Sequence, residues 1–149
     1  MKRLRGWWLL AVLLAALPLI FPGNYYINVV GSSAGLFAIL AVGLNLLMGY
    51  AGQISLGHAA FFGLGAYASA ILTTRYGWNP WSALGAGLVL SGLVAYLIAR
   101  PILGLKGHYL AMATLGFGII VHIILVQTGG LTGGPDGIGE IPPLSIFGW

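Results

Sequence analysis

The sequence has 149 residues, of which 59% are hydrophobic and 5% are charged, and it contains no cysteine. Soluble domains carry charge on roughly a quarter of their residues, so this composition predicts an integral membrane protein and excludes a sizeable soluble domain. The formal net charge of +4 does not indicate a nucleic-acid-binding patch, because the cationic residues lie at the ends of apolar segments. At such positions they act as topology signals.

Five apolar segments predict an all-α protein with about five transmembrane helices in a single domain. Three cationic residues precede the first segment and Pro22 closes it, and no small-residue cleavage site follows. A retained helix is therefore favoured over a secretory signal peptide. We expect residues 23–28 to form a turn-like link, and Arg100 and Pro101 to end the fourth helix. The predicted helices cover residues 7–21, 29–50, 55–74, 82–99 and 109–127, and a Gly/Pro-rich tail covers residues 128–149.

Residues 43–72, with the sequence GLNLLMGYAGQISLGHAAFFGLGAYASAIL, interrupt this apolar pattern between the second and third helices. The break begins at Gly49 and Gly52, and Gln53, Ser55 and His58 follow it closely. Unpaired backbone and polar side chains are costly at membrane depth unless they are buried in protein or line a wet cavity. One interpretation is a tight turn whose polar residues cap the next helix. The other is a broken helix beside a transport path, and the pattern alone does not separate the two.

Two further polar side chains, Asn45 and His122, lie inside apolar runs. An intramembrane polar residue is a functional hypothesis by default, although a hydrogen bond across a helix interface is the alternative. The three histidines lack the spacing of metal ligands. The sequence contains neither a phosphate-binding loop nor a nucleophile–base set. We therefore expect no catalytic residue, no metal and no cofactor.

Small residues recur every four positions, which places them on one helix face. Such stripes let neighbouring backbones approach closely in a membrane. One predicted stripe lies on the fourth helix and consists of Ala83, Gly87, Ser91, Ala95 and Ala99. The other crosses the start of the third helix and consists of Ala51, Ser55, Ala59 and Gly63.

The distribution of cations predicts the orientation. A cytoplasmic N-terminus places five of the six cationic residues inside and leaves only Arg75 outside with both acids, Asp136 and Glu140. This is the pattern that the positive-inside rule describes. The tail of residues 128–149 would then be extracytoplasmic, provided that residues 49–58 do not re-enter the membrane.

Three blocks of the sequence carry a family resemblance. They are residues 43–72, quoted above, residues 103–121, LGLKGHYLAMATLGFGIIV, and residues 131–143, LTGGPDGIGEIPP. In this order and spacing they resemble the LivM-like permease subunit of bacterial branched-chain amino-acid ABC importers. Close relatives within the same family are similar to permeases for urea or short amides.

The resemblance implies a non-enzymatic subunit of the bacterial inner membrane that moves leucine, isoleucine or valine. It implies three kinds of partner: a second homologous permease, two cytoplasmic ATPase subunits and a periplasmic substrate-binding protein. Family members run to roughly twice this length, so the chain is expected to be the N-terminal half of a larger bundle. Ile119 and His122 stand where the family usually has Glu and Arg, which bears on substrate choice or helix packing.

Two other functions remain open from the sequence. A stand-alone secondary carrier or channel would be expected to hold a buried carboxylate for ion coupling, and the predicted helices contain none. A non-transporting structural fragment is the third alternative, because half of a pathway is not expected to conduct.

Overall fold

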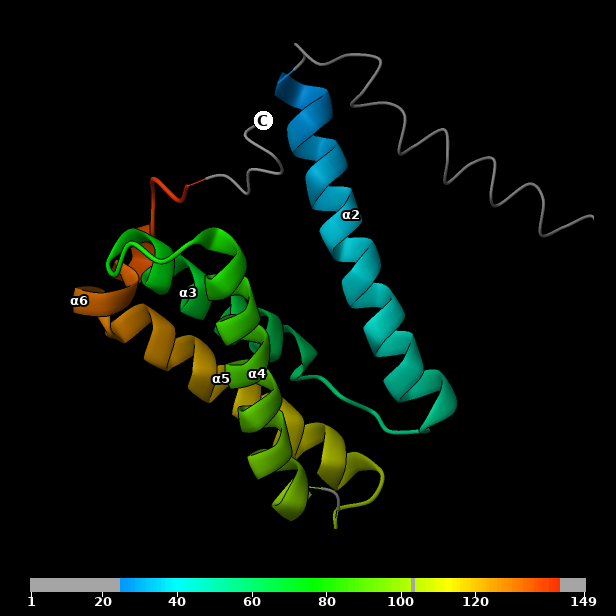
Figure 1. The fold of residues 1–149 in the computed structure, drawn as a ribbon. Coiled ribbons are helices and arrows are strands. Elements are labelled where there is room, and N and C mark those ends of the chain that lie inside the picture. Colours follow the sequence, from blue (N-terminus) through cyan, green and yellow to red (C-terminus); the bar gives the residue numbers. More distant parts are fainter. Residues whose placement is uncertain (1–24, 103, 143–149) are drawn as a thin grey trace, which may run out of the picture. The chain divides into compact units, whose positions relative to one another are not determined.

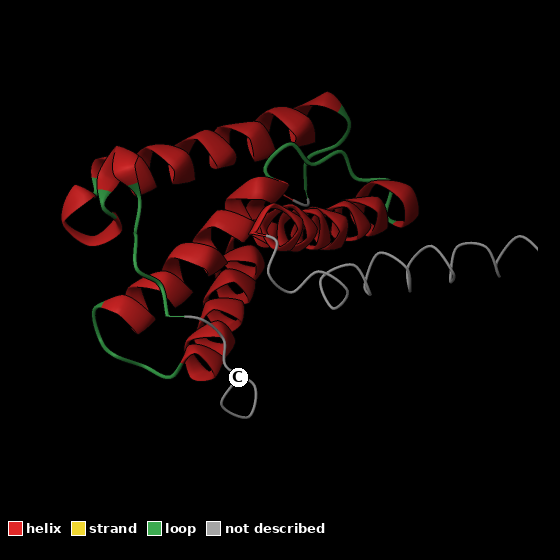
Figure 2. Cartoon of the chain, turned by 90° about the horizontal axis from the view of Figure 1, so that it is seen from above, coloured by secondary structure: helices red, strands yellow, loops and turns green. Residues whose placement is uncertain are grey.

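The computed structural model describes residues 25–102 and 104–142, and throughout these ranges the chain forms helices and loops without a strand (Figure 2). The predicted all-α class is therefore confirmed. The first predicted helix, at residues 7–21, lies outside the described residues. The elements in chain order are α2 (Tyr25–Asn45), the π-helix η1 (Leu46–Tyr50), α3 (His58–Thr74), α4 (Pro80–Ile102), α5 (His108–Gln127), α6 (Gly129–Thr132) and the 3-10 helix η2 (Gly134–Asp136).

Three of the described helical stretches are long and apolar enough to cross a membrane: Val29–Tyr50, Pro80–Ile102 and His108–Gln127. They correspond to the second, fourth and fifth predicted helices. The third predicted helix is present as α3, whose 17 residues reach about 25 Å at the rise of an α-helix. The length and composition of these helices agree with an integral membrane protein.

The chain divides into two compact units, residues 1–43 and 44–149. In the first unit the described structure is most of α2, whose sequence YYINVVGSSAGLFAILAVGLN presents apolar residues around the whole helix. A helix that is apolar on all sides suits a membrane span. It begins at Tyr25, so the predicted link at residues 23–28 is wrong from that residue onward.

In the second unit, α3 and α4 form a helical hairpin and α5 packs against α3 (Figure 1). Small residues on α4 make the close contact. Ala83 is fully buried, and a Cβ built on Gly87 would lie 2.7 Å from the carbonyl oxygen of Gly65. Ser91 donates a hydrogen bond to the carbonyl of Phe61 at 3.0 Å. The predicted stripe on the fourth helix therefore packs against α3 at these positions.

The second predicted stripe is wrong in its first half. Ala51 and Ser55 lie in a non-helical stretch, because α3 begins at His58 instead of residue 55. A four-residue period places side chains on one face only within a helix. Ala59 and Gly63 do lie on α3, beside a cavity described below.

The fourth helix is longer than predicted at both ends. At its start, the Asn79 side-chain oxygen accepts the backbone N–H of Trp81 at 3.0 Å, and Pro80 occupies the first helical position, where its missing N–H costs nothing. At its end, the helix continues through Pro101 to Ile102. Proline lacks a backbone N–H and therefore removes one helical hydrogen bond. The helix tolerates this loss because it ends one residue later.

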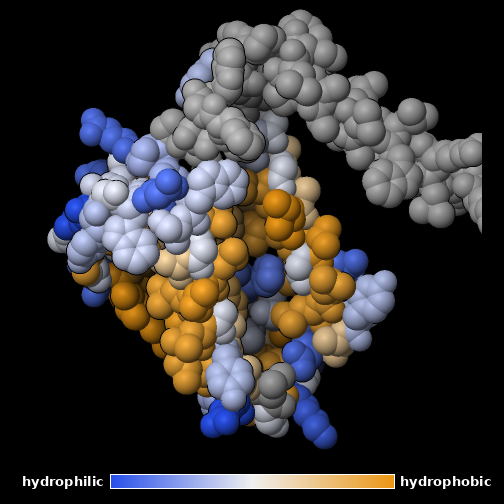
Figure 3. Space-filling view, viewed as in Figure 1, coloured by the Kyte–Doolittle hydropathy of each residue, from blue (hydrophilic) through white to orange (hydrophobic). Residues whose placement is uncertain are grey.

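The surface of α4 shows a band of apolar side chains between two more polar ends (Figure 3). Arg75, Tyr76 and Trp78 lie in the exposed link before α4. At the other end, the Arg100 guanidinium lies 5.6 Å from the centre of the Tyr96 ring. Aromatic and cationic residues are enriched where helices meet the membrane–water interface, so this pattern agrees with a span between these ends.

Candidate transport site

The helix break starts with a widened helical turn. The π-helix η1 follows Asn45 and ends at Tyr50, and the N–H of Ala51 donates to the carbonyl of Leu46 at 3.2 Å. A Cβ on Gly49 would lie only 2.9 Å from the Asn45 side-chain oxygen, so glycine leaves room for that side chain. Single π-turns occur frequently at functional sites. Asn45 and Gly49 therefore shape the beginning of the break together.

An irregular segment, residues 51–57, follows the π-turn. Gly52 has a φ of +64°, in the left-handed region that glycine adopts without steric cost. The N-cap of α3 is Gly57, and no side chain caps it. The interpretation in which Gln53 or Ser55 caps this helix is therefore wrong. Ser55 is buried instead, with 8% of its surface exposed.

The end of this segment contacts the middle of α5. The N–H of Leu56 donates to the Thr114 hydroxyl at 3.0 Å, and a Cβ on Gly118 would lie 3.5 Å from the Cα of Gly57. Thr114 and Gly118 are the seventh and eleventh residues of the 20-residue helix α5, about 9 and 15 Å from its start. If α5 spans the membrane, the segment meets it well inside the apolar core.

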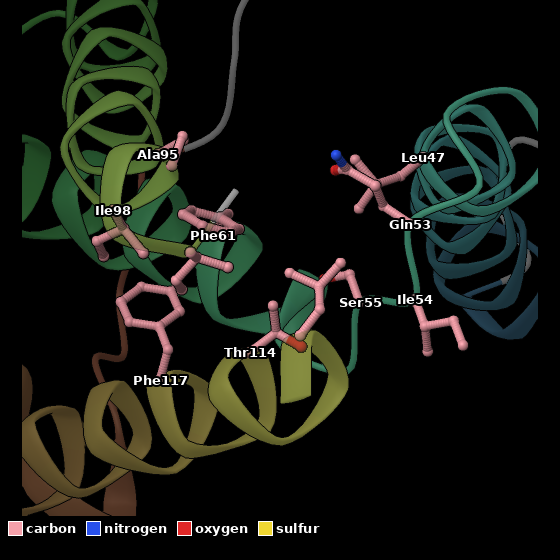
Figure 4. A pocket seen from close by; sticks show the side chains of 12 residues that line it. Leu47, Gln53, Ile54, Ser55, Phe61, Ala95, Ile98, Thr114 and Phe117 are labelled. Atoms are coloured by element: carbon pink, nitrogen blue, oxygen red, sulfur yellow. The ribbon is translucent and has the colours of Figure 1, made fainter. Parts of the chain in front are cut away.

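A cavity of about 190 Å³ adjoins the segment. Figure 4 shows Phe61, Ile98 and Phe117 on one side and Leu47 and Gln53 on the other. The rings of Phe61 and Phe117 lie 5.1 Å apart between centroids. Polar groups enter the lining through three residues: Gln53, Ser55 and Thr114. The site is thus a mostly apolar hollow with a few hydrogen-bonding groups, the usual composition of a small-molecule site.

The structure separates the other predicted site residues from this cavity. His58 begins α3, is half-buried and lines neither of the two cavities described here. His122 is exposed on α5 and lines a second cavity of about 400 Å³ between α3 and α5, together with Tyr67 and Ile119. Ile119 and His122 therefore border the same hollow.

Thr114, Phe61 and Phe117 are lining residues that the sequence analysis missed. Thr114 is a small polar residue in an apolar run, and that is a weak signal on its own. The two phenylalanines are 56 residues apart in the sequence and meet only through the packing of α3 on α5.

The Gly-rich tail forms a compact cap after α5. The buried Thr132 hydroxyl lies 2.6 Å from the carbonyl oxygen of Leu125 and 2.8 Å from that of Thr128. It also accepts the N–H of Gly134 at 3.3 Å. Gly133, with a φ of +76°, packs directly against the Gly137 carbonyl oxygen. The Gly–Gly–Pro–Asp–Gly sequence of residues 133–137 therefore forms a turn, in which the N–H of Gly137 donates to the carbonyl of Gly134 at 3.2 Å.

Long apolar helices, a broken helix and a mostly apolar cavity beside the break are features that membrane transport proteins share. The chain belongs to the family described as "Branched-chain amino acid transport system / permease component", which matches residues 26–148. This match confirms the family that the three sequence blocks indicate.

Two curated relatives are permease proteins named LivM of high-affinity branched-chain amino acid transport systems. The chain is 42% identical to the one from Salmonella typhimurium and 41% identical to the one from Escherichia coli K12. Each alignment covers 113 residues, which is 76% of this chain and 27% of the relative. Both relatives are therefore more than twice as long as this chain, longer than the sequence analysis expected for the family. No solved structure matches the chain significantly.

Proposed function

We propose that the chain is part of the permease subunit of an ATP-driven importer that carries branched-chain amino acids across the bacterial inner membrane. The observation that carries this proposal is a helix break that borders a mostly apolar cavity in a chain of this permease family. Both curated relatives are named for branched-chain amino acid transport, which supports the same cargo for this chain.

The cavity lining suits such a cargo. The side chains of Phe61, Ile98 and Phe117 offer an apolar wall that is complementary to the branched aliphatic side chain of leucine, isoleucine or valine. On the opposite side, the Gln53 amide offers both a donor and an acceptor. Urea and short amides carry little apolar surface and would gain little from this wall.

The proposed importer has three kinds of partner. A second homologous permease completes the pathway, two cytoplasmic ATPase subunits supply the energy, and a periplasmic binding protein delivers the substrate. The absence of a phosphate-binding loop from the sequence supports a division of labour in which this subunit is not the enzyme. The N-terminus is proposed to be cytoplasmic, because most cations then lie inside.

Reconstitution of the full-length permease with these partners in vesicles tests the proposal. We expect uptake of labelled leucine that requires both ATP and the binding protein, that isoleucine and valine inhibit, and that urea leaves unchanged. Uptake that requires neither ATP nor the binding protein would contradict an ATP-driven importer. Uptake that stops when the proton gradient is dissipated while ATP remains would indicate a secondary carrier.

A further inference from the structure

Thr114 makes two hydrogen bonds of different kinds from one hydroxyl group. It donates to the carbonyl of Ala111 in the preceding turn of α5 at 3.0 Å, a common local bond for threonine in helices. It also accepts the backbone N–H of Leu56, 58 positions earlier in the sequence, at 3.0 Å. The second bond is the one that joins α5 to the irregular segment.

The segment makes few backbone hydrogen bonds of its own. Within the part of the chain that the structure describes, the N–H groups of residues 52–56 donate two bonds, from Gln53 to the carbonyl of Leu47 and from Leu56 to Thr114. Five consecutive residues in the middle of a helix would donate five such bonds. The first bond ties the segment to the π-turn, and the second ties its far end to α5.

Two glycines bring the backbones together at the same point. Gly57 is buried, and a Cβ at this position would overlap the carbonyl oxygen of Thr114. A Cβ on Gly118, one turn further along α5, would contact the Cα of Gly57 at 3.5 Å. The two backbones therefore pack directly on each other, and the Thr114 hydroxyl provides the polar bond at their crossing.

We infer that Thr114 is a positioning residue, which holds the irregular segment of residues 52–57 against the middle of α5. It thereby places Gln53 and Ser55 at the cavity. The consequence for transport rests on the proposed function, whereas the positioning itself is measured without transport.

The test uses a cysteine in place of Ser55, a conservative change at a buried position in a chain without cysteines. The full-length permease carrying Ser55→Cys, with any other cysteines removed, is labelled with a water-soluble maleimide in membranes. The rate is compared among three further changes. Thr114→Val removes the hydroxyl at similar shape, and Thr114→Ser retains it. Thr73→Val is the matched control, because the buried Thr73 hydroxyl bonds only within α3, to Ser69 and Ala70.

We expect Thr114→Val to raise the labelling rate about fivefold, the effect of losing one net hydrogen bond. Thr114→Ser and Thr73→Val should label at the parental rate. The inference fails if Thr114→Val labels at the parental rate, or if Thr114→Ser labels as fast as Thr114→Val. It also fails if Thr73→Val gives the same increase, because that result would indicate general loosening of the bundle.

Uptake by the same variants, without the introduced cysteine, separates this inference from the proposed function. If Thr114→Val lowers leucine uptake and Thr114→Ser restores it, both hold. If labelling responds as expected but the parental permease transports no branched-chain amino acid, the proposed function fails and the positioning role stands. If the parental permease transports leucine but labelling does not respond, the inference alone fails.

Discussion

Residues 51–57 and 128–137 are both Gly-rich interruptions of an apolar sequence, yet they direct their hydrogen bonds differently. The later region bonds to itself and to the last turn of α5 directly before it, through the buried Thr132 hydroxyl and the neighbouring backbone. The earlier region bonds to the π-turn before it and to Thr114 of another helix, and it borders a cavity. Buried backbone polar groups must find hydrogen-bond partners. Where those partners lie therefore distinguishes the tail, a structural cap, from the break, a candidate path.

Substituting Gly57 tests this comparison with the largest expected effect. In Gly57→Ala the new Cβ would overlap the Thr114 carbonyl oxygen, and relieving such overpacking typically costs about 1–3 kcal/mol. Because the strain falls on the segment beside the cavity, we expect leucine uptake to be nearly lost. Gly116→Ala is the control, since a Cβ there meets nothing within 4 Å. Equal uptake by both variants would show that the close crossing is unimportant.

Gln53→Ala removes the one long polar side chain of the cavity lining without changing the backbone. We expect leucine uptake per mole of permease to fall about threefold to tenfold, the effect of one lost hydrogen bond at the substrate, while expression stays unchanged. His58→Ala is a fitting companion, because His58 lines neither described cavity and its loss should reduce uptake less. A larger effect at His58 would place the path elsewhere along α3.

Thr132→Val tests the other half of the comparison. It breaks the bonds that hold the tail cap together and to the end of α5, and it leaves the buried N–H of Gly134 without its acceptor. The free energy of unfolding should therefore fall by about 1–3 kcal/mol. Uptake per mole of folded permease should stay near the parental value. Thermal unfolding in detergent and uptake are measured on the same preparation. Strongly reduced uptake with unchanged unfolding would assign the tail a direct role in transport.

His122→Ala is expected to have the smallest effect on uptake. The exposed imidazole borders the second cavity and forms none of the contacts that hold the break. Leucine uptake within about twofold of the parental value is expected, less than one net hydrogen bond would give. A loss comparable to that of Gln53→Ala would move the candidate path toward the hollow between α3 and α5.

The sequence predicted much of this arrangement because the signals were local. Apolar runs located α2, α3, α4 and α5, glycines located the break, and the Gly/Pro-rich composition located the tail. The start of α3 at His58 was missed, because the segment before it is fixed by α5, a contact far away in the sequence. Thr114 was missed for the same reason, since its partner lies 58 residues away. The earlier start of α4 could have been predicted from Asn79 and Pro80, because a capping residue followed by proline is typical of a helix start.

The central claim of the proposal is that the helix break faces an aqueous path that carries substrate. The most direct test is the reaction of a single cysteine at Gln53 in the full-length permease with a charged, water-soluble thiol reagent. A cysteine at Val89, on the exposed apolar surface of α4, serves as the lipid-facing control. We predict that Gln53→Cys reacts, loses leucine uptake on reaction, and is protected by leucine, whereas Val89→Cys does not react. A Gln53→Cys permease as unreactive as Val89→Cys would contradict the claim.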